Sequence, residues 1–555
     1  MRNPLRDQKV WALALVTTVL AAGVSAQQQA PQPPGTIQPS APAPQPGATG
    51  PQVPEATDQY QVGAAVPEGT PGSDLLNLTL EQATDIALER NLDLRAARLN
   101  PQGVDYQLQA ARAAFNPQFG GTYSYRDAAQ PNNNPLEERS RLNNIGQTFN
   151  VNMSQSLPWH GGRLTANFNN NRQSTNSSLT ILNPSYSSGL QFNYTQPLLA
   201  GFKIDNSRNQ LRTLSVQRQI ADIQLLTTIE NTKASVRTAY WTLRQAIEQI
   251  EIQRRSLELA QRLYQDNRTK VEIGTLAPIE TLTSETQVAN AEQALLNAQI
   301  GWRTAELNLK RLLADGPEDP LYQATINPIE RPELSVQSVD IPSAIRTALD
   351  QRTDLTQARR NLEISQLNLD ITANSTKPQL DLSAGYNASG QGGARLDRDT
   401  GERLPGGYRD AVSQVVGLDL PTWNVQFNFT YPLFMRAARA NFARAQLQIQ
   451  QSEATLRAQE LTVTAAVTNA GLAVENTYKQ FQAAQKAREV AERNAEAEQT
   501  RFDVGMSTNY NVVQAQDNLT SQRLAELRAI IGYLNAVAEF DRIQRVGGGG
   551  GGGAN

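Results

Sequence analysis

The stretch "FDVGMSTNYNVVQAQ" (residues 502–516) interrupts a long helical pattern, and "VEIGTLAPIETLTSE" (residues 271–285) interrupts an earlier one in the same way. Gly505 and Gly274 stand where a helix can end in a left-handed residue, because glycine has no Cβ to obstruct that conformation. Each stretch therefore predicts a helical hairpin, in which a long helix ends and the chain folds back.

Long coiled-coil helices are predicted to lead into both turns. From about residue 204 to 270 the sequence has no proline or glycine, and a second candidate helix runs from about 437 to 501. Apolar residues recur in both with the seven-residue spacing of a coiled coil. They are Ile229, Val236, Tyr240, Leu243, Ile247, Ile250, Leu257, Tyr264, Val467, Val474, Tyr478 and Phe481. A helix of about 65 residues spans roughly 100 Å, so such rods must pack side by side.

Small residues flank the coiled-coil seam and offer a second packing surface, for example Ala466, Ala470 and Ala473. Two seams on one helix let it pack against a neighbour on each side, which closes a ring of helices into a tube. A single antiparallel coiled coil is the simpler alternative. It does not by itself explain the strands and the secretory signal on the same chain.

The interval between about 78 and 546 is internally duplicated. At a constant offset of 261 residues, the second half repeats Ala83, Ala87, Leu88, Asp93, Leu94, Ala97, Arg98, Asn100, Leu108, Pro117, Gln118 and Tyr125 as Ala344, Ala348, Leu349, Asp354, Leu355, Ala358, Arg359, Asn361, Leu369, Pro378, Gln379 and Tyr386. Likewise "LQFNYTQPL" (190–198) recurs as "VQFNFTYPL" (425–433). Each half is predicted to contain a helix, strands, a long helix, a glycine turn and a helix, in that order.

The strand segments alternate between two kinds of side chain. In residues 149–157, 164–170, 190–194 and 425–431, aromatic or aliphatic residues alternate with Asn, Gln, Ser or Thr. This period of two predicts strands. A small neutral polar face suits a water-filled lumen behind a lipid-facing band, which favours a β-barrel over a soluble sheet, whose outer face usually carries Lys and Glu.

The ends of the chain have the composition of processing and linker segments. Residues 1–26 have a basic start, an apolar stretch and a small-x-small cleavage site, which predicts a signal peptide. Residues 27–75 are a Pro/Gln-rich disordered linker, residues 76–336 and 337–546 are the two repeats, and residues 547–555 are a Gly-rich disordered tail. After the predicted signal peptide, the sequence contains no run of about 18 apolar residues, so no transmembrane helix is predicted. Entry into a membrane would therefore need a closed barrel.

Composition and motifs argue against an enzyme. The 555 residues include 50 basic and 53 acidic residues, a near-neutral balance that argues against a nucleic-acid partner. With no cysteine there can be no disulfide or thiolate metal site, and the lone His160 reads as a solvated turn residue. The sequence has no phosphate-cradling glycine loop, nucleophile elbow or cluster of metal ligands. We therefore expect no catalytic residues, metal or cofactor.

From about residue 78 to 543 the sequence resembles the TolC-type outer-membrane efflux proteins of Gram-negative bacteria. The resemblance rests on the duplication, the Pro-Leu entry into each long helix, the glycine turns, and the Arg-Phe-x-x-Gly form at Arg501, Phe502 and Gly505. It implies an α+β membrane protein: a homotrimer with an outer-membrane β-barrel that continues into a periplasmic α-helical barrel. It further implies a channel or exit duct that works with a periplasmic adaptor and an inner-membrane pump of RND or ABC type.

The number of strands departs from the family pattern. That family normally contributes four strands per protomer to a twelve-stranded barrel, whereas this sequence offers six candidates because of an additional hairpin around residues 157–164. Either the barrel is wider or the hairpin belongs to a loop region.

The resemblance places acidic residues just after the hairpin turns, at a charged constriction of the periplasmic entrance. Glu280 keeps that charge, while Asn511 and Gln514 in the second repeat are neutral amides. We therefore expect Glu280 to set most of the entrance charge. Ser507 stands where the resemblance places an arginine, so a salt bridge that locks the closed state is not expected there. The hairpin-tip residues expected to contact an adaptor are Gly274, Thr275, Gly505, Met506 and Ser507.

Two other functions remain compatible with the sequence. One is a passive porin and the other is a structural, envelope-spanning coiled-coil protein. A porin would not need rods of roughly 100 Å or duplicated tips.

Overall fold

The structure is a computed structural model that describes residues 65–67, 74–137, 139–331, 339–397 and 399–547. The predicted signal peptide, most of the predicted linker and nearly all of the glycine-rich tail lie outside these residues.

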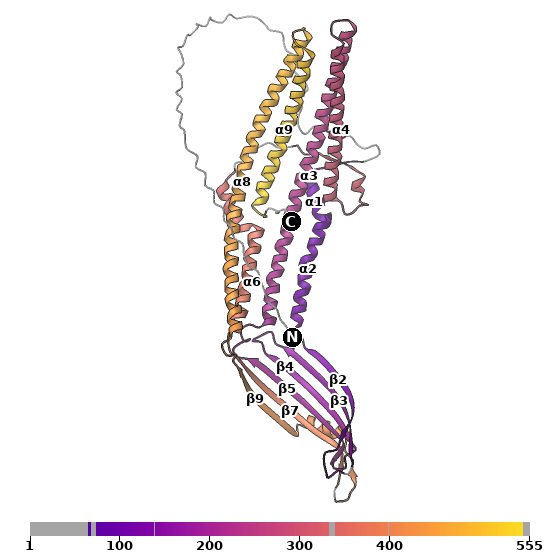
Figure 1. Cartoon of the computed structure of the whole chain (residues 1–555), viewed down its shortest axis with the longest axis vertical. Coiled ribbons are helices and arrows are strands. Elements are labelled where there is room, and N and C mark those ends of the chain that lie inside the picture. The colour runs from indigo at the N-terminus through magenta and orange to yellow at the C-terminus, as the bar shows by residue number, and fades with distance from the viewer. Residues whose placement is uncertain (1–64, 68–73, 138, 332–338, 398, 548–555) are drawn as a thin grey trace, which may run out of the picture. The chain divides into compact units, whose positions relative to one another are not determined.

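Two very long helices dominate the described chain (Figure 1). Helix α3 (Asn206–Glu272) has 67 residues and α8 (Arg436–Asp503) has 68. Each is followed, after a glycine turn, by a shorter antiparallel helix: α4 (Ile279–Leu313) packs along α3, and α9 (Asn509–Ile543) packs along α8. The predicted long helices are confirmed, with ends within two residues of those read from the sequence.

The coiled-coil spacing also corresponds to burial. Val236, Tyr240 and Leu243 on α3 are fully buried. Val467 and Val474 on α8 are buried in an apolar cluster with Tyr533, Phe540 and Ile543 on α9.

Shorter helices pack against the long ones and precede the strands in each half. In the first half α1 (Leu80–Arg90) and α2 (Leu92–Ala113) contact α3, and in the second half α5 (Ile341–Gln351) and α6 (Thr353–Ser375) contact α8. The side chains of Thr79, Asn91 and Asp340 accept backbone hydrogen bonds at the starts of α1, α2 and α5, as expected of N-caps.

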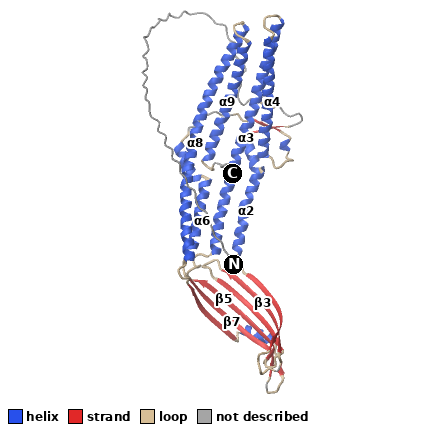
Figure 2. Cartoon of the chain, viewed as in Figure 1, coloured by secondary structure: helices blue, strands red, loops and turns tan. Residues whose placement is uncertain are grey.

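The main sheet is antiparallel and follows on from the ends of the helices (Figure 2). Its order is β2-β3-β4-β5-β7, and β9 pairs with the other edge of β7. The long strands are β2 (Gln118–Pro131), β3 (Arg141–Ser156), β4 (Arg163–Thr175), β5 (Leu182–Pro197), β7 (Gln379–Leu396) and β9 (Leu420–Thr430). The short β8 (Arg403–Leu404) pairs with the far end of β7.

The hairpin that the sequence left undecided belongs to this sheet. Strands β3 and β4 pair continuously from Asn144 opposite Thr175 to Ser156 opposite Arg163, and β4 pairs with β5 in turn. The described residues thus include six long strands, because the additional hairpin pairs fully within the sheet and is not a loop.

The two faces of the sheet differ in chemistry, as the alternating pattern predicted. The first, here called the aromatic face, carries the exposed side chains of Phe119, Tyr123, Tyr125, Phe149, Phe192, Tyr386, Trp423, Phe427 and Phe429. The second, here called the amide face, carries Asn150, Asn152, Asn167, Asn169, Gln191, Asn193, Asn387, Asn424, Gln426 and Asn428. Because successive strand residues point to opposite faces, one register separates the two sets throughout.

A small parallel sheet lies against the middle of α3. Strand β1 (Leu75–Leu78) pairs with β6 (Thr325–Pro328), which follows the 3-10 helix η1 (Pro320–Tyr322). The Tyr240 hydroxyl on α3 donates to Leu78 O (3.0 Å) and accepts from Glu330 N (3.1 Å). Burial raises the pKa of the Tyr240 phenol to about 12, so it stays a neutral donor.

A buried ion pair lies in the same region. Arg244 and Glu248 on α3 lie 2.8 Å apart, and Arg244 Nη1 also donates to Pro328 O and to Ala65 O. Ala65, within the segment predicted as linker, donates its N–H to Glu248 (3.3 Å).

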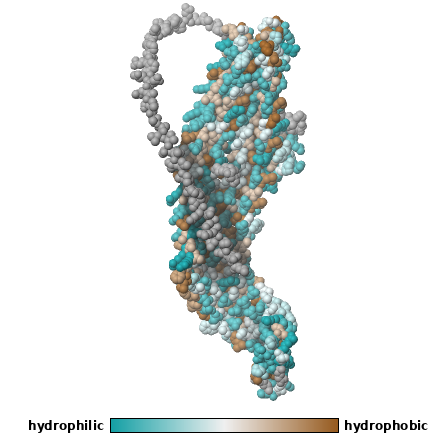
Figure 3. Space-filling model, in the orientation of Figure 1, coloured by the Kyte–Doolittle hydropathy of each residue, from teal (hydrophilic) through white to brown (hydrophobic). Residues whose placement is uncertain are grey.

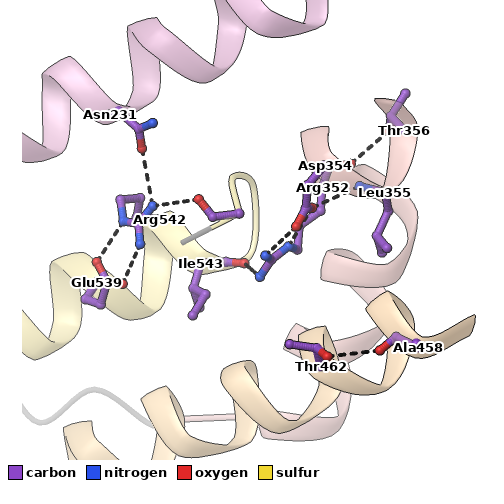
Figure 4. Close-up of polar contacts among 11 residues, drawn as sticks. Asn231, Arg352, Asp354, Leu355, Thr356, Ala458, Thr462, Glu539, Arg542 and Ile543 are labelled. Carbon is purple, nitrogen blue, oxygen red and sulfur yellow. Dashed lines mark hydrogen bonds and ion pairs between the residues drawn. The ribbon is translucent and has the colours of Figure 1, made fainter. Parts of the chain in front are cut away.

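Two arginines secure the C-terminal end of α9 (Figure 4). Arg352 Nη1 donates to Ile543 O (2.9 Å), and the same guanidinium pairs with Asp354 at 2.8 Å. Burial alone would raise the pKa of the Asp354 carboxyl, but the hydrogen bonds and charge of Arg352 bring it below its usual range. Arg542 donates to Asn231 on α3 (3.3 Å) and thereby links α9 to the first long helix.

One helix was not expected from the sequence. Helix α7 (Tyr408–Gly417) follows β8 and packs on β5 and β7. Among the described helices, none is both long enough and apolar enough to cross a membrane.

Candidate functional site

The two glycine turns have nearly the same geometry. Gly274 has φ +78° and Gly505 has φ +77°. In each, the amide after the glycine reaches back to the last helical turn: Thr275 N donates to Lys270 O (2.9 Å) and Met506 N to Arg501 O (2.7 Å). A Cβ at either glycine would meet nothing within 4 Å, so the backbone conformation, not space, requires glycine. The predicted hairpins are confirmed.

A polar cluster joins the two hairpins just behind the turns. It consists of Asn267 on α3, Glu280 and Ser284 on α4, and Asn509 on α9, here called the asparagine cluster. Asn267 Nδ2 donates to Ser284 Oγ (2.6 Å) and to Asn509 Oδ1 (2.8 Å). Asn509 Nδ2 in turn lies 3.2 Å from Glu280 Oε2 and 3.3 Å from Ser284 Oγ. Asn267, Ser284 and Asn509 are at most 1% exposed, whereas Glu280 is half-buried.

The asparagine cluster is imperfectly satisfied and has little apolar support. Within the described structure, the buried Asn267 Oδ1 has no hydrogen-bond partner, which is a cost in a desolvated site. The neighbouring apolar cluster contains only three buried residues, Leu263, Phe502 and Val512. Lys270 Nζ lies 4.0 Å from the centre of the Phe502 ring and adds a cation–π contact. The contact between hairpins therefore combines specific polar geometry with a small packed apolar area.

The predicted site residues make different contacts. Glu280 contacts Asn509, and not Asn511 or Gln514. Asn511 is exposed and its amide donates to Ser507 Oγ (3.3 Å), while the side chain of Gln514 is exposed on α9.

Ser507 is held by its own hairpin. Its hydroxyl donates to Glu498 Oε2 (2.8 Å), and Arg501 pairs with the other oxygen of that carboxylate at 2.6 Å. The hydrogen bond from Ser507 and then that from Arg501 lower the pKa of Glu498, so this carboxylate stays ionised.

Neither Asn267 nor Asn509 was predicted from the sequence as a site residue. A signal for Asn267 was present, because it continues the buried seam of Ala260 and Leu263, where a polar residue is unusual and often specifies register. Asn509 directly follows the N-cap Thr508 and offered no such signal.

A third missed residue, Asp517, supplies an acidic group on α9. It lies three residues beyond Gln514, one turn farther from the tip. Gln287 Nε2 on α4 donates to Asp517 Oδ1 at 2.5 Å, in a polar groove also lined by Gln253 and Arg528. Partial desolvation in this groove raises the pKa of Asp517 more than the hydrogen bond from Gln287 lowers it.

We expect Asp517→Asn to stabilise the protein modestly at neutral pH and to lose this effect in acid. A raised folded pKa means that ionisation of Asp517 opposes folding. This cost is absent below the unfolded pKa near 3.8 and grows as pH rises through the folded pKa. Thermal unfolding midpoints of wild type and variant at pH 7.5 and pH 4 would measure it. An equal difference at both values would show that the carboxyl is not desolvated.

The hairpins carry exposed apolar side chains around the turns. Ile273, Ile279, Val504 and Met506 are each more than 60% exposed, and hydrophobic residues are visible at the hairpin ends in Figure 3. In the described residues, no group of three or more His, Asp or Glu side chains is arranged to hold a metal ion.

Comparison with known protein families gave a match over most of the described chain. The family model described as "Outer membrane efflux protein" matches residues 83–178, 163–315 and 344–543. A comparison with curated protein sequences found no match.

Several solved structures share the fold. The CmeC outer membrane channel of Campylobacter jejuni has a TM-score of 0.60 at 18% identity, covering 84% of this chain and 85% of that one. VceC from Vibrio cholerae has 0.60 at 13% identity, covering 84% and 96%. The open state of the MtrE outer membrane channel of Neisseria gonorrhoeae has 0.56 at 17% identity, covering 88% and 97%.

Proposed function

This chain belongs to the outer membrane efflux protein family, and from that premise we propose that three copies form an exit duct through the cell envelope. In this proposal the main sheets join into an outer-membrane β-barrel, and the long helices continue it as a tube in the periplasm. A periplasmic adaptor and an inner-membrane pump of RND or ABC type deliver the cargo. The joint occurrence of an exposed aromatic face and helices of 67 and 68 residues in one chain carries the proposal.

The aromatic face supports contact with outer-membrane lipid. Phe119 and Trp423, on the two outermost strands β2 and β9, are 75% and 76% exposed. Aromatic and aliphatic residues on one face, backed by neutral amides on the other, match a lipid-facing band around an aqueous lumen.

Exposed apolar stripes on α4 and α8 support packing between copies. Helix α4 exposes Ile279, Leu282, Leu296, Ile300 and Leu307. These residues have a coiled-coil spacing. Among the described elements, α4 packs extensively only against α3. Helix α8 exposes Leu447, Leu461, Leu472 and Val490. We propose that α4 of one copy packs against α8 of the next.

The sheet edges complete the same ring. Strands β2 and β9 are the two edges, and they run in opposite directions, so β9 of one copy can pair with β2 of the next in the antiparallel sense. Three copies of six long strands then close into a barrel of eighteen strands, which removes every open edge.

The hairpin tips form the proposed entrance. In a trimer, six tips narrow the periplasmic end. The Glu280 side chains supply the fixed charge there, and the exposed amides of Asn511 and Gln514 flank them. The asparagine cluster holds the hairpins of one copy together, and outward movement of the Gly274 and Gly505 turns opens the passage. The exposed apolar residues at the tips, Met506 among them, are the proposed adaptor contact, together with Gly274, Thr275, Gly505 and Ser507.

Single-channel recording tests both the duct and its entrance. We expect purified protein in planar bilayers to conduct with a preference for cations, and Glu280→Gln to reduce that preference because it removes the fixed charge. The exposed Glu285 on α4 provides the control, since Glu285→Gln should leave the selectivity nearly unchanged. Reversal potentials in a KCl gradient measure the effect.

The outcomes separate the competing functions. Unchanged selectivity in Glu280→Gln would remove Glu280 from the entrance. Absence of any conductance would favour a structural tether. A conductance that stays the same after the hairpins are cross-linked would favour a passive porin.

A further inference from the structure

Helix α7 lies directly on the aromatic side of the sheet. A Cβ added to Gly390 would come within 2.0 Å of Ala411 O, and one on Gly392 within 2.1 Å of Gly407 O. Both glycines share a strand face with Tyr386, because they differ from it by even numbers of residues. Because these two positions on β7 have no side chain, the helix backbone can pack directly against the sheet.

Polar and apolar contacts fix α7 in this place. The Tyr408 hydroxyl donates to Asn170 Oδ1 on β4 (2.9 Å). The Gln414 side chain accepts from Gln391 N (3.1 Å) and donates to Gln391 O (2.9 Å), so it occupies the edge of β7 where pairing with β9 has ended. Ala411 and Val415 are buried against the sheet. The helix is a docked element with a defined orientation.

The C-terminal end of α7 points toward the aromatic residues. The helix starts beside Gly392 and passes Gly390 within its next turn, so it runs down β7 toward Tyr386. At this end Val416 is 77% exposed and Leu418 is 50% exposed. The charged residues of the helix, Arg409 and Asp410, lie at its other end.

We propose that α7 is a membrane-surface helix whose last turn enters the outer leaflet. Its occupant is lipid at the boundary between headgroups and acyl chains, which Val416 and Leu418 contact. This inference rests on the proposed function, since it requires the aromatic face to meet lipid. Continuity favours lipid over a protein partner: the exposed apolar end of α7 lies on the same face as Tyr386 and Trp423, at the margin of the proposed lipid band.

A short helix in this position gives the strands an anchor at the level of the outer interface. An interfacial helix places its apolar side about 5–10 Å into the headgroup and acyl boundary. Here the depth would be set by the contacts to Gly390, Gly392 and Gln391, because these fix the helix on the sheet.

Site-directed spin labelling tests the proposal, and the natural chain has no cysteine to interfere. Single variants Val416→Cys, Ser413→Cys and Val425→Cys would be labelled with a nitroxide in the full chain, reconstituted in phospholipid vesicles. Ser413 is exposed one helical turn before Val416, nearer the start of α7, and Val425 lies on the aromatic face. Power saturation then compares collisions with oxygen, which enriches in lipid, and with a water-soluble nickel chelate.

We expect the label at position 416 to favour oxygen, as the label at 425 does, at a depth of about 5–10 Å below the phosphates. The label at 413 should favour nickel. Equal nickel access at 416 and 413 would overturn the membrane-surface role while leaving the duct intact. Shielding of 416 from both reagents would also overturn it, since a protein surface would then cover the helix. Nickel access at 425 would overturn the lipid-facing barrel itself, and the inference with it.

Discussion

Replacing Arg244 by methionine is expected to destabilise the helical part of the protein by about 3–5 kcal/mol. The side chains of Arg244 and Glu248 are 3% and 0% exposed and lie 2.8 Å apart on α3. Removal of the guanidinium takes a cation 2.8 Å away from the buried Glu248 carboxylate. It also removes the hydrogen bonds to Pro328 O in β6 and to Ala65 O, which lies before β1. Both bonds connect these segments to α3.

A matched pair on the same helix provides the control. Arg262 and Glu258 have the same i,i+4 spacing, but their side chains are 71% and 58% exposed. Arg262→Met should therefore cost only about 0–1 kcal/mol. Thermal unfolding of both variants, with hydrogen exchange of the amides in β6, measures the difference. The double variant Arg244→Met, Glu248→Leu should recover much of the loss, because two apolar residues replace the pair. If Arg244→Met cost no more than Arg262→Met, the buried charges would not support the junction.

Removal of β3 and β4 is expected to narrow the outer-membrane part of the duct. Deletion of residues 141–175 leaves four long strands per copy and, in a trimer, twelve in place of eighteen. Barrel diameter grows roughly linearly with strand number, so it should fall to roughly two thirds. Strands β2 and β5 can then pair, because Phe119 and Phe192 already stand at the same level of the sheet and on the same face.

The largest polymer that can enter the lumen reports the diameter of the barrel. Gln426 lies on the amide face of β9, away from the deleted strands, so Gln426→Cys reports on the interior in both backgrounds. Intact cells would be treated with maleimide-linked polyethylene glycols of increasing size, and the modification read as a shift on a gel. The full-length chain should react with larger polymers than the deletion variant. Val425→Cys, on the opposite face of the same strand, controls for reaction from outside the barrel. The same size limit in both backgrounds would contradict six strands per copy.

Local signals in the sequence were sufficient for the individual elements. The seven-residue spacing around Val236 and Val467 predicted two long coiled-coil helices, because a buried helical stripe has that period. The run without proline or glycine from about 204 to 270 predicted the ends of the first helix to within two residues. Gly274 and Gly505 predicted the turns because few other residues adopt a left-handed conformation without strain. The alternation around Phe192 and Phe427 predicted strands with two chemically different faces, because a strand has a period of two.

Contacts between distant residues were decided only by the tertiary structure. Glu280 and Asn509 are 229 residues apart, and no local pattern indicated that one would bind the other. The hairpin of β3 and β4 could have been a loop, and its inclusion in the sheet depends on a register shared with β2 and β5. Helix α7 can pack on the sheet only because Gly390 and Gly392 have no side chains beneath it. The sequence by itself determined which elements form, since periodicity acts over neighbouring residues. Only the packing of the whole chain determined which of their side chains meet, since that depends on how elements far apart in the sequence fit together.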